Sequence, residues 1–348
     1  MRRLRRRTVR SLGVACAVLV LVAAGTGCAG KKPAESPAPG QEVTVVYGGS
    51  QWLGHYPAMI GIEKGYFKEQ GMRAIFQGFY TSSGRMGAMA AGQLDVATTG
   101  VISALSLMAS ANESFYVVGT PDSYAKLEGI VAKSDINSIE ELKGKKLAVT
   151  FSSSAHVMVY DVLAQHGLDP AKDVQLINMG INDMPSAFAT GQIDAAAPWT
   201  PAFEKLLAMP GCHLLVNDEE FSLYKQYKVG PGPDVLVVSR TFADKNPELA
   251  KKFVAAYFKA CEFLKDPANL QEAAQIISQY TGLDPQTQVE SLKTITWYSG
   301  AEQQELMVNP GSFVQGVKML AKFLVDHKLL DKEAPVEKYL RTDLLPAK

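Results

Sequence analysis

Apolar and polar positions follow one pattern that occurs twice along the chain. Each time, an apolar strand runs into a short polar loop, a helix follows and ends at a glycine, and a second strand comes next. This order with short connections is typical of a parallel sheet flanked by helices. The first copy has a strand at 43–47, a loop at 48–50, a helix at 56–68, Gly71 and a strand at 74–79. The second has a strand at 146–150, a loop at 151–154, a helix at 157–165, Gly167 and a strand at 174–178.

A ten-residue motif marks the two copies as one duplicated unit. Residues 88–97 are AMAAGQLDVA and residues 187–196 are AFATGQIDAA, an offset of 99 residues. This offset is much longer than the period of a solenoid. Each motif predicts a helix C-terminus, a glycine stop, a polar turn and a short strand. The sequence therefore predicts two α/β lobes of the same design.

Two apolar strands, at 127–132 and 234–238, bracket the second copy and predict the crossings between the lobes, and thus the hinge. We assign residues 41–127 plus 237–348 to lobe 1 and residues 128–236 to lobe 2. Beyond Thr241 the chain turns helical, and the spacing of its apolar residues predicts a tail that packs back on lobe 1. The predicted helices lie at 247–264, 269–281, 285–293 and 310–327.

The polar loops predict where a ligand binds. In open α/β sheets, ligands bind beyond the carboxyl ends of the strands, and these loops lie there and also open helices. Helix N-termini attract anions by about 0.3–2 kcal/mol each. Two lobes facing each other across a cleft describe a clamshell receptor for a small molecule. Ordinary helix capping is the alternative for any single loop. The candidate residues are Ser50, Gln51, Thr81, Ser82, Gly100, Ser153, Ser154 and His156.

Asp234 is the sharpest polar signal, because it begins a strongly apolar strand at a predicted crossing. An ionised carboxylate in a drying cleft is costly unless it is paired, and a cationic group on the ligand would pair with it. Backbone amides or a distant Lys are the alternative partners. Trp52, Tyr56 and Trp199 lie on the same loops and are candidates for covering a ligand or binding its ammonium, although aromatic residues there are often core residues.

The first 27 residues predict a secretory signal. Six Arg precede the apolar run at 12–24, which is shorter than the roughly 20 residues that span a bilayer, and small residues lead to Cys28. A Cys at this point resembles the lipobox of bacterial lipoproteins, whose thiol is acylated. A plain secretion signal is the alternative. Residues 28–40 are rich in Pro, Gly, Ala and Ser, so we expect a flexible tether that holds the folded part outside the cell membrane.

Charge and cysteine content narrow the class of partner that we expect for this protein. The signal carries six of the 35 basic residues and none of the 35 acidic ones, so the remaining chain has 29 basic and 35 acidic residues and a net charge of −6. This argues against nucleic acid or an anionic lipid surface as the main partner. We expect a monomer. Cys212 and Cys261 remain after processing, and their spacing does not decide whether they pair.

Catalysis finds little support in the sequence. The five His residues are scattered, no hydrolase nucleophile motif is present, and no metal-ligand spacing occurs. We therefore predict a binding protein that is not an enzyme and needs no cofactor or metal.

Four segments carry a family resemblance that covers 43–330. Residues 66–72 (YFKEQGM), 90–97 (AAGQLDVA), 141–147 (ELKGKKL) and 191–195 (GQIDA) resemble the nitrate/sulfonate/taurine family of substrate-binding proteins of ABC importers. Within the family, residues 151–156, 198–202 and 233–240 are most similar to taurine-binding proteins. The resemblance implies a type II-like periplasmic-binding-protein fold with the ligand in the cleft between the lobes.

The resemblance also implies a ligand and a partner. It implies that the Ser/Thr loops and backbone amides hold a sulfonate and that Asp234 binds the amine of a zwitterion such as taurine, which an ABC permease then receives. Three alternatives stay open: an aromatic or pyrimidine ligand stacked between Trp52 and Trp199 or a nitrate-type ligand, a secreted enzyme on the same scaffold, and a sensor that signals to a membrane kinase.

Overall fold

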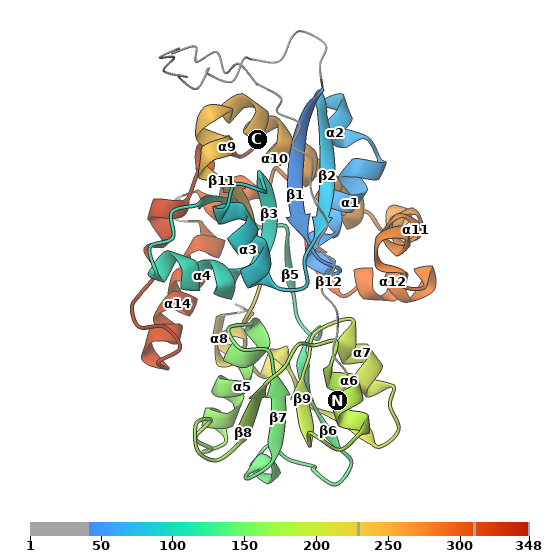
Figure 1. Cartoon of the computed structure of the whole chain (residues 1–348), viewed down its shortest axis with the longest axis vertical. Helices are drawn as coiled ribbons and strands as arrows, with labels where there is room; N and C mark the ends of the chain where they lie inside the picture. The colour runs from blue at the N-terminus through green and yellow to red at the C-terminus, as the bar shows by residue number, and fades with distance from the viewer. Residues whose placement is uncertain (1–41, 228–229, 309–310, 347–348) are drawn as a thin grey trace, which may run out of the picture. The chain divides into compact units, whose positions relative to one another are not determined.

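The computed structural model describes residues 42–227, 230–308 and 311–346, which contain two five-stranded sheets and one two-stranded sheet (Figure 1). The first sheet contains β1 (Val43–Gly49), β2 (Met72–Gly78), β3 (Val96–Gly100), β4 (Phe115–Gly119) and β11 (Asp234–Ser239). The second contains β6 (Gly129–Lys133), β7 (Lys146–Val149), β8 (Gln175–Asn178), β9 (Ala195–Ala197) and β10 (Cys212–Asn217). The small sheet pairs β5 (Asp122–Tyr124) with β12 (Ile295–Trp297).

The two large sheets have the same topology. The first runs β2-β1-β3-β11-β4 and the second runs β8-β7-β9-β6-β10. In each, the first three strands are parallel and the last two pair antiparallel to their neighbours. The duplication inferred from the sequence thus corresponds to two copies of one sheet.

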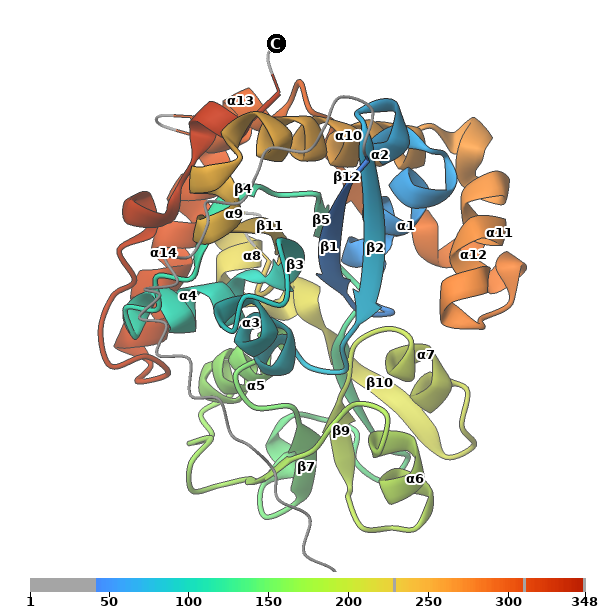
Figure 2. The same ribbon diagram turned by 45° about the horizontal axis from the view of Figure 1, so that its top comes forward.

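Helices cover both faces of each sheet (Figures 1 and 2). The helices around the first sheet are α1 (Tyr56–Glu63), α2 (Tyr66–Glu69), α3 (Ser82–Ala90), α4 (Val101–Ala109), α9 (Arg240–Lys245), α10 (Pro247–Lys265), α11 (Leu270–Thr281), α12 (Pro285–Leu292), α13 (Gln303–Met307) and α14 (Ser312–Asp326). The second sheet has α5 (Ser154–Gln165), α6 (Met184–Ala189) and α7 (Ala202–Leu207), whereas Leu223 and Tyr224 of α8 (Ser222–Tyr227) pack against the core of the first sheet. The four helices predicted beyond Thr241 are all present, each to within two residues at its ends.

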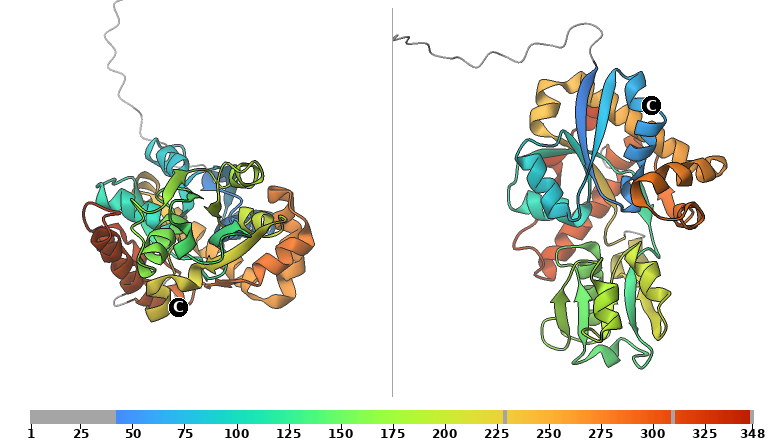
Figure 3. Two further views of the ribbon diagram at one scale, coloured as in Figure 1. Left: turned by 90° about the horizontal axis from the view of Figure 1, so that it is seen from below. Right: turned by 45° about the vertical axis from the view of Figure 1, so that its right-hand side comes forward.

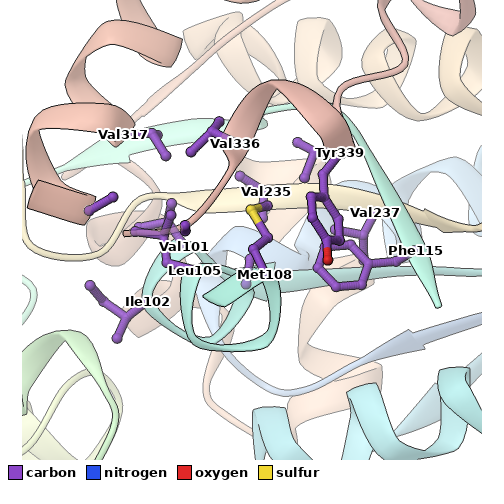
Figure 4. Packing of buried hydrophobic residues seen from close by; sticks show 14 of the residues in the cluster. Val101, Ile102, Leu105, Met108, Phe115, Val235, Val237, Val317, Val336 and Tyr339 are labelled. Atoms are coloured by element: carbon purple, nitrogen blue, oxygen red, sulfur yellow. The ribbon is translucent and has the colours of Figure 1, made fainter. Parts of the chain in front are cut away.

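Side chains on successive strand residues enter different cores, as the two-residue period of a strand requires. In the second sheet, Leu147 and Val149 pack with α5, whereas Ala148 packs with α6 and α7 on the opposite face. The right-hand view of Figure 3 shows this sheet with its helices. In the first sheet, Val235 and Val237 of β11 pack with α4 and α14 (Figure 4). Leu236 and Val238 pack with α10, so the helical tail returns to the first sheet as expected.

The repeated motif has the same structural role in both lobes. Gly92 and Gly191 adopt φ of 75° and 71° after their helices, a conformation that favours glycine. The motif acids then hydrogen-bond to equivalent strands, β1 in the first sheet and β7 in the second. Oδ2 of Asp95 accepts from the backbone N–H of Val46 at 2.8 Å, and Oδ2 of Asp194 accepts from that of Lys146 at 3.0 Å. The conspicuous acids of the motif are therefore structural.

The crossings lie just before β6 and β11. Strand β6 belongs to the second sheet, whereas the whole of β11 pairs with β3 and β4 of the first. The lobe boundary predicted between residues 236 and 237 therefore falls inside a strand of the first sheet. We use lobe 1 and lobe 2 below for the parts built on the first and second sheets. Among residues 42–227, 230–308 and 311–346, no helix has the length and apolar content needed to cross a bilayer.

Candidate functional site

Asp234 begins β11 and contacts the loop that follows β1. The indole Nε1 of Trp52 donates a hydrogen bond to Oδ2 of Asp234. Asp234 is 2% exposed, and Trp52 is half-buried. Burial raises the pKa of Asp234 to about 7, although the Trp52 hydrogen bond and the positive charge of Arg85 oppose this. The carboxyl group therefore changes charge close to neutral pH.

His55 approaches the same carboxylate from the short turn Leu53–His55. Its Nδ1 accepts a hydrogen bond from the backbone N–H of Ser50 at 2.8 Å, which places the ring proton of the neutral imidazole on Nε2. This Nε2 lies 3.8 Å from Oδ1 of Asp234 and, within the described residues, has no hydrogen-bond partner. Burial and the charge of Arg85 lower the pKa of His55, so the ring is neutral and does not neutralise Asp234.

Asp122, the first residue of β5, is a second buried carboxylate beside Asp234. Its Oδ1 accepts from the backbone N–H of Asp234 at 3.4 Å. A Cβ atom on Gly54 would lie 1.9 Å from Oδ2 of Asp234 and 2.5 Å from Oδ2 of Asp122. The absence of a side chain at Gly54 therefore allows both carboxylates to converge there. Burial and the negative charge of Asp234 raise the pKa of Asp122.

Arg85, in the first half of α3, supplies a buried positive charge to the same region. Its Nη2 donates to Oγ of Ser82 at 3.0 Å, while Nε has no partner in the described part of the chain. Only 2% of the residue is exposed, and burial lowers its pKa to about 10, with Asp234 opposing that shift. Lobe 1 thus contains a buried base and two buried acids that act on one another electrostatically.

Glu128 provides a further buried carboxylate, just before β6 at the first crossing. Its Oε2 accepts a hydrogen bond from Oγ of Ser154 at 2.7 Å. Its backbone forms an isolated antiparallel bridge with Trp199, and its carbonyl accepts from the N–H of Asp218 at 3.1 Å. Burial raises the pKa of Glu128, and it raises that of Asp218 to about 6.

Tyr124 connects these groups. Its hydroxyl donates to the carbonyl of Gly232, and its ring packs edge-on against Trp52 with centroids 5.0 Å apart. Gly232 in turn lies against Ser154, because a Cβ atom on Gly232 would be 2.2 Å from Cβ of Ser154. After burial, the charges of four acids raise the pKa of Tyr124. We call these four acids the carboxylate cluster: Asp122, Glu128, Asp218 and Asp234.

Seven of the residues predicted from the sequence lie in or against this region. Trp52 and Asp234 bond directly, and Gly100 lies opposite Asp234 in the register of β3 and β11. Ser50 is linked to the region by its hydrogen bond with His55, and Ser82 is linked to it by its hydrogen bond with Arg85. Ser154 and Trp199 join through Glu128.

Five others have different surroundings. Tyr56 is 1% exposed in an apolar cluster that also contains Tyr124 and Trp52, and its hydroxyl donates to the carbonyl of Gln51 at 3.2 Å. The Gln51 side chain donates to the carbonyl of Thr281 at 3.4 Å. Thr81 and Ser153 cap α3 and α5. His156 stacks on Phe151 with ring centroids 4.6 Å apart, and burial lowers its pKa to about 4.

Sequence reasoning missed Arg85 and three of the four acids. Asp122 begins β5, Glu128 precedes β6 and Asp218 follows β10, so the feature that they share in the sequence is a place at a strand end, where solvated acids are also common. Cys212 and Cys261 are free thiols, and Cys261 is buried in α10. In the described ranges, no three His, Cys, Asp or Glu side chains are grouped to hold a metal ion.

Comparisons with known proteins agree on the family. The sequence model of the NMT1-like family matches residues 37–278. A putative binding protein of Brucella abortus is 26% identical over 293 residues, covering 83% of this chain and 87% of its own. The taurine-binding periplasmic protein of Escherichia coli is 27% identical over 219 residues, covering 61% of this chain and 66% of its own.

Solved structures agree on the fold. The alkanesulfonate-binding protein SsuA from Xanthomonas axonopodis, bound to MOPS, superposes with a TM-score of 0.69 at 20% identity, covering 86% of this chain and 99% of its own. The desulfurization enzyme DszB superposes with a TM-score of 0.60 at 14% identity, covering 87% of this chain and 97% of its own. The resemblance and the fold predicted from the sequence are confirmed. The family match covers more than half of the chain, so this protein belongs to the NMT1-like family and has the periplasmic-binding-protein fold.

Proposed function

We propose that this protein is a lipid-anchored substrate-binding protein of an ABC importer, and that it captures a small sulfonate or zwitterion such as taurine. Family membership and the names of its relatives support the transport role. The basic and apolar N-terminal segment that leads to Cys28 supports the anchor; both lie outside the described residues.

The observation that carries the choice of ligand is the burial of Arg85 and Asp234 in one site, each 2% exposed. Buried charges require partners, and a zwitterion offers one charge of each sign. The ammonium of taurine pairs with Asp234. The sulfonate accepts from the unpartnered Nε of Arg85 and from hydroxyl groups around it, such as that of Ser82. The Asp234 carboxylate is covered, so ligand entry displaces Trp52, whose hydrogen bond the ammonium replaces.

An aromatic heterocycle such as an aminopyrimidine is a second candidate. Two features favour it: Trp52 packs edge-on against Tyr124, and carboxylate oxygens of Asp122 and Glu128 have no partner among the described residues. An amino group on a ring would donate to such oxygens while the ring packs on Trp52.

The DszB likeness raises the question of catalysis on this scaffold. We propose binding without catalysis. Cys212 lies on β10, and Cys261 is buried in the core of lobe 1, where burial and the negative charge of Asp122 raise the pKa of its thiol and disfavour the nucleophilic thiolate. The His55 ring lies between Oγ of Ser50, 2.8 Å from Nδ1, and Oδ1 of Asp234, 3.8 Å from Nε2. Its Nδ1 already accepts from the backbone N–H of Ser50, so this nitrogen is poorly placed to take a proton from the Ser50 hydroxyl.

A thermal-shift screen tests the function and ranks the ligands. Its members are taurine, ethanesulfonate, nitrate, amino acids and an aminopyrimidine. A ligand at 100 times its dissociation constant stabilises a protein by about 2.7 kcal/mol, a shift of a few degrees in a chain of this size. We expect the largest shift with taurine. A larger shift with the aminopyrimidine selects the second candidate, and no shift with any member contradicts the proposal.

The transport role needs its own test, because a sensor that signals to a kinase also binds its ligand. We propose an ABC permease as the partner. Purified protein loaded with radiolabelled ligand should support ATP-dependent uptake into vesicles that contain its candidate ABC permease. Uptake that is independent of the binding protein contradicts this partner.

A further inference from the structure

Asp122 and Asp234 form a close pair of buried carboxylates. Oδ2 of Asp122 and Oδ2 of Asp234 both lie within 2.5 Å of the position that a Cβ atom of Gly54 would take. The two carboxylate oxygens are therefore close neighbours. The residues are 0% and 2% exposed. Two ionised carboxylates at this separation, away from water, repel each other strongly.

The groups around the pair leave it without a full positive counter-charge. Arg85 acts on Asp234, but the hydrogen bonds of its Nη2 go to Ser82 and Thr99. His55 is neutral and directs its unpartnered Nε2 toward Oδ1 of Asp234. The other titratable groups that act on the pair or feel its charge are neutral or acidic side chains: Tyr47, Tyr124, Glu128, Tyr257, Cys261 and Tyr298.

Two buried polar atoms at this pair have no partner among the described residues, one an acceptor and one a donor. Oδ2 of Asp122 lacks a donor, and Nε2 of His55 lacks an acceptor, although both are buried among the described residues. Leaving such an atom unpaired is destabilising, so folded proteins seldom retain one without a reason. An N–H donor from outside the chain would satisfy the oxygen, and the pair would supply the negative charge to hold it.

We propose that Asp122 and Asp234 together form a cation subsite that holds one proton when the protein is empty and exchanges it for the positively charged nitrogen of the ligand. This proposal rests on the proposed function and specifies its ligand as an amine that is already protonated. The balance is simple: the ligand brings one positive charge, and one proton leaves the pair for the solvent. Asp122 thereby becomes a binding residue in addition to Asp234.

Electrostatics supports the exchange. Burial and the neighbouring charge raise the pKa of Asp122, and burial raises that of Asp234 to about 7. The empty pair therefore retains a proton below neutral pH. A ligand ammonium favours the ionised form of both groups, so it lowers their affinity for that proton. Affinity for the amine should rise as pH rises toward 7, because less work is then needed to remove the proton.

Isothermal titration in buffers of different ionisation enthalpy tests the exchange. Taurine is titrated into the wild-type protein about one unit below the pKa of Asp234, in a phosphate buffer and in an amine buffer. We expect release of about one proton per ligand bound. Ethanesulfonate, which has no amine, should release none. Asp122→Asn should release a smaller fraction of a proton. Asp161→Asn is the matched control, because Asp161 is a buried acid in lobe 2 that bonds with Gln165 and Ser222.

Each outcome decides between the two proposals. Proton release with taurine, reduced in Asp122→Asn but not in Asp161→Asn, supports the subsite. Taurine binding without proton release overturns the subsite and leaves the transport function intact. Binding of ethanesulfonate without binding of taurine also overturns the subsite and leaves the transport function intact. If neither binds, both the subsite and the sulfonate proposal fail.

A measurement without ligand guards against a folding defect in the variant. The wild-type protein should lose stability as pH rises from about 4 to about 7, because in that range the folded pair still holds a proton that the unfolded chain has released. Asp122→Asn removes one carboxylate, so its stability should fall less over the same range. Equal slopes for the two proteins overturn the subsite whatever the titrations show.

Discussion

The indole of Trp52 donates a hydrogen bond to the carboxylate of Asp234 across 182 residues of sequence. This bond ties the loop after β1 to the first residue of β11, which the chain reaches only after it has built lobe 2. The same indole packs edge-on against Tyr124 at the other crossing. One half-buried aromatic side chain thus contacts residues beside both connections between the lobes, so we expect a ligand that moves Trp52 to affect both connections.

Replacing Asp234 should separate ligands by charge. Asp234→Asn keeps the acceptor for Trp52 but removes the negative charge. We expect it to weaken taurine binding by roughly 2–5 kcal/mol, because the ammonium then stays buried without its partner. Binding of ethanesulfonate should change far less. Isothermal titration with both ligands measures the difference, and equal losses would mean that Asp234 serves the hinge instead of the ligand.

The prominence of Asp234 in the sequence came from a local contrast, a lone acid at the start of an apolar strand. The same kind of local signal predicted the fold, because strand alternation, glycine stops and the 88–97 and 187–196 motifs each depend on neighbouring residues. Two identical sheet topologies followed from that duplication. Local patterns of this kind can be recognised in a sequence without knowing which distant residues are in contact.

The neighbouring residues Ser153 and Ser154 should have different effects. Ser153 caps α5 by accepting from the N–H of His156 at 3.2 Å, whereas Ser154 donates to Glu128. We expect Ser153→Ala to lower the free energy of unfolding by about 1 kcal/mol and to change ligand affinity little. Ser154→Ala leaves a buried carboxylate without its donor, so it should alter affinity as well as stability. Urea unfolding and titration on both variants check this, and interchanged effects would contradict the assignment.

The remainder of the site could not be predicted, because its contacts join residues far apart in sequence. Asp122 meets Asp234 at a separation of 112 residues, and Arg85 reaches the same region from α3. Nothing beside Asp122 or Glu128 in the sequence distinguishes a buried acid from the solvated acids that are common at strand ends. The sequence predicts Tyr56 as a binding residue from its place on a ligand loop. The structure buries it in a core that also contains Trp52 and Tyr124, and its contribution to ligand binding stays a prediction.

Asp218→Asn should reduce the pH dependence of stability. The folded-state pKa of Asp218 is about 6, above its ordinary value of 3.8. The folded protein therefore binds more protons than the unfolded chain between these values, and stability present at lower pH is lost as pH rises through about 6. The loss from this group is on the order of 1–3 kcal/mol. Unfolding free energies from about pH 4 to pH 8 should show a shallower fall in the variant, and an unchanged fall contradicts the assignment.

Gly54→Ala should damage the site through steric conflict. The added methyl group would meet the carboxylate oxygens of both Asp234 and Asp122. We expect a loss of about 1–3 kcal/mol in stability, as for other overpacked sites, and a larger relative loss of taurine binding. Gly87→Ala is a suitable control, because a Cβ atom at Gly87 meets no atom within 4 Å. Equal effects from both substitutions would show that glycine is not required for the approach of the two carboxylates.

Cys28→Ser tests the proposed anchor independently of the site. Cys28 lies outside the described residues and is separated from β1 by a segment rich in Pro, Gly and Ala. Stable anchoring takes two or more acyl chains, which only the cysteine thiol and the new N-terminus at that point would carry. The variant should therefore leave the membrane fraction while keeping the taurine affinity of the wild-type protein. Fractionation, mass spectrometry of the N-terminus and isothermal titration measure the three quantities. Wild-type protein that is soluble and not cut after Gly27 contradicts the anchor, whereas loss of affinity in Cys28→Ser would mean that the N-terminal segment contributes to ligand binding.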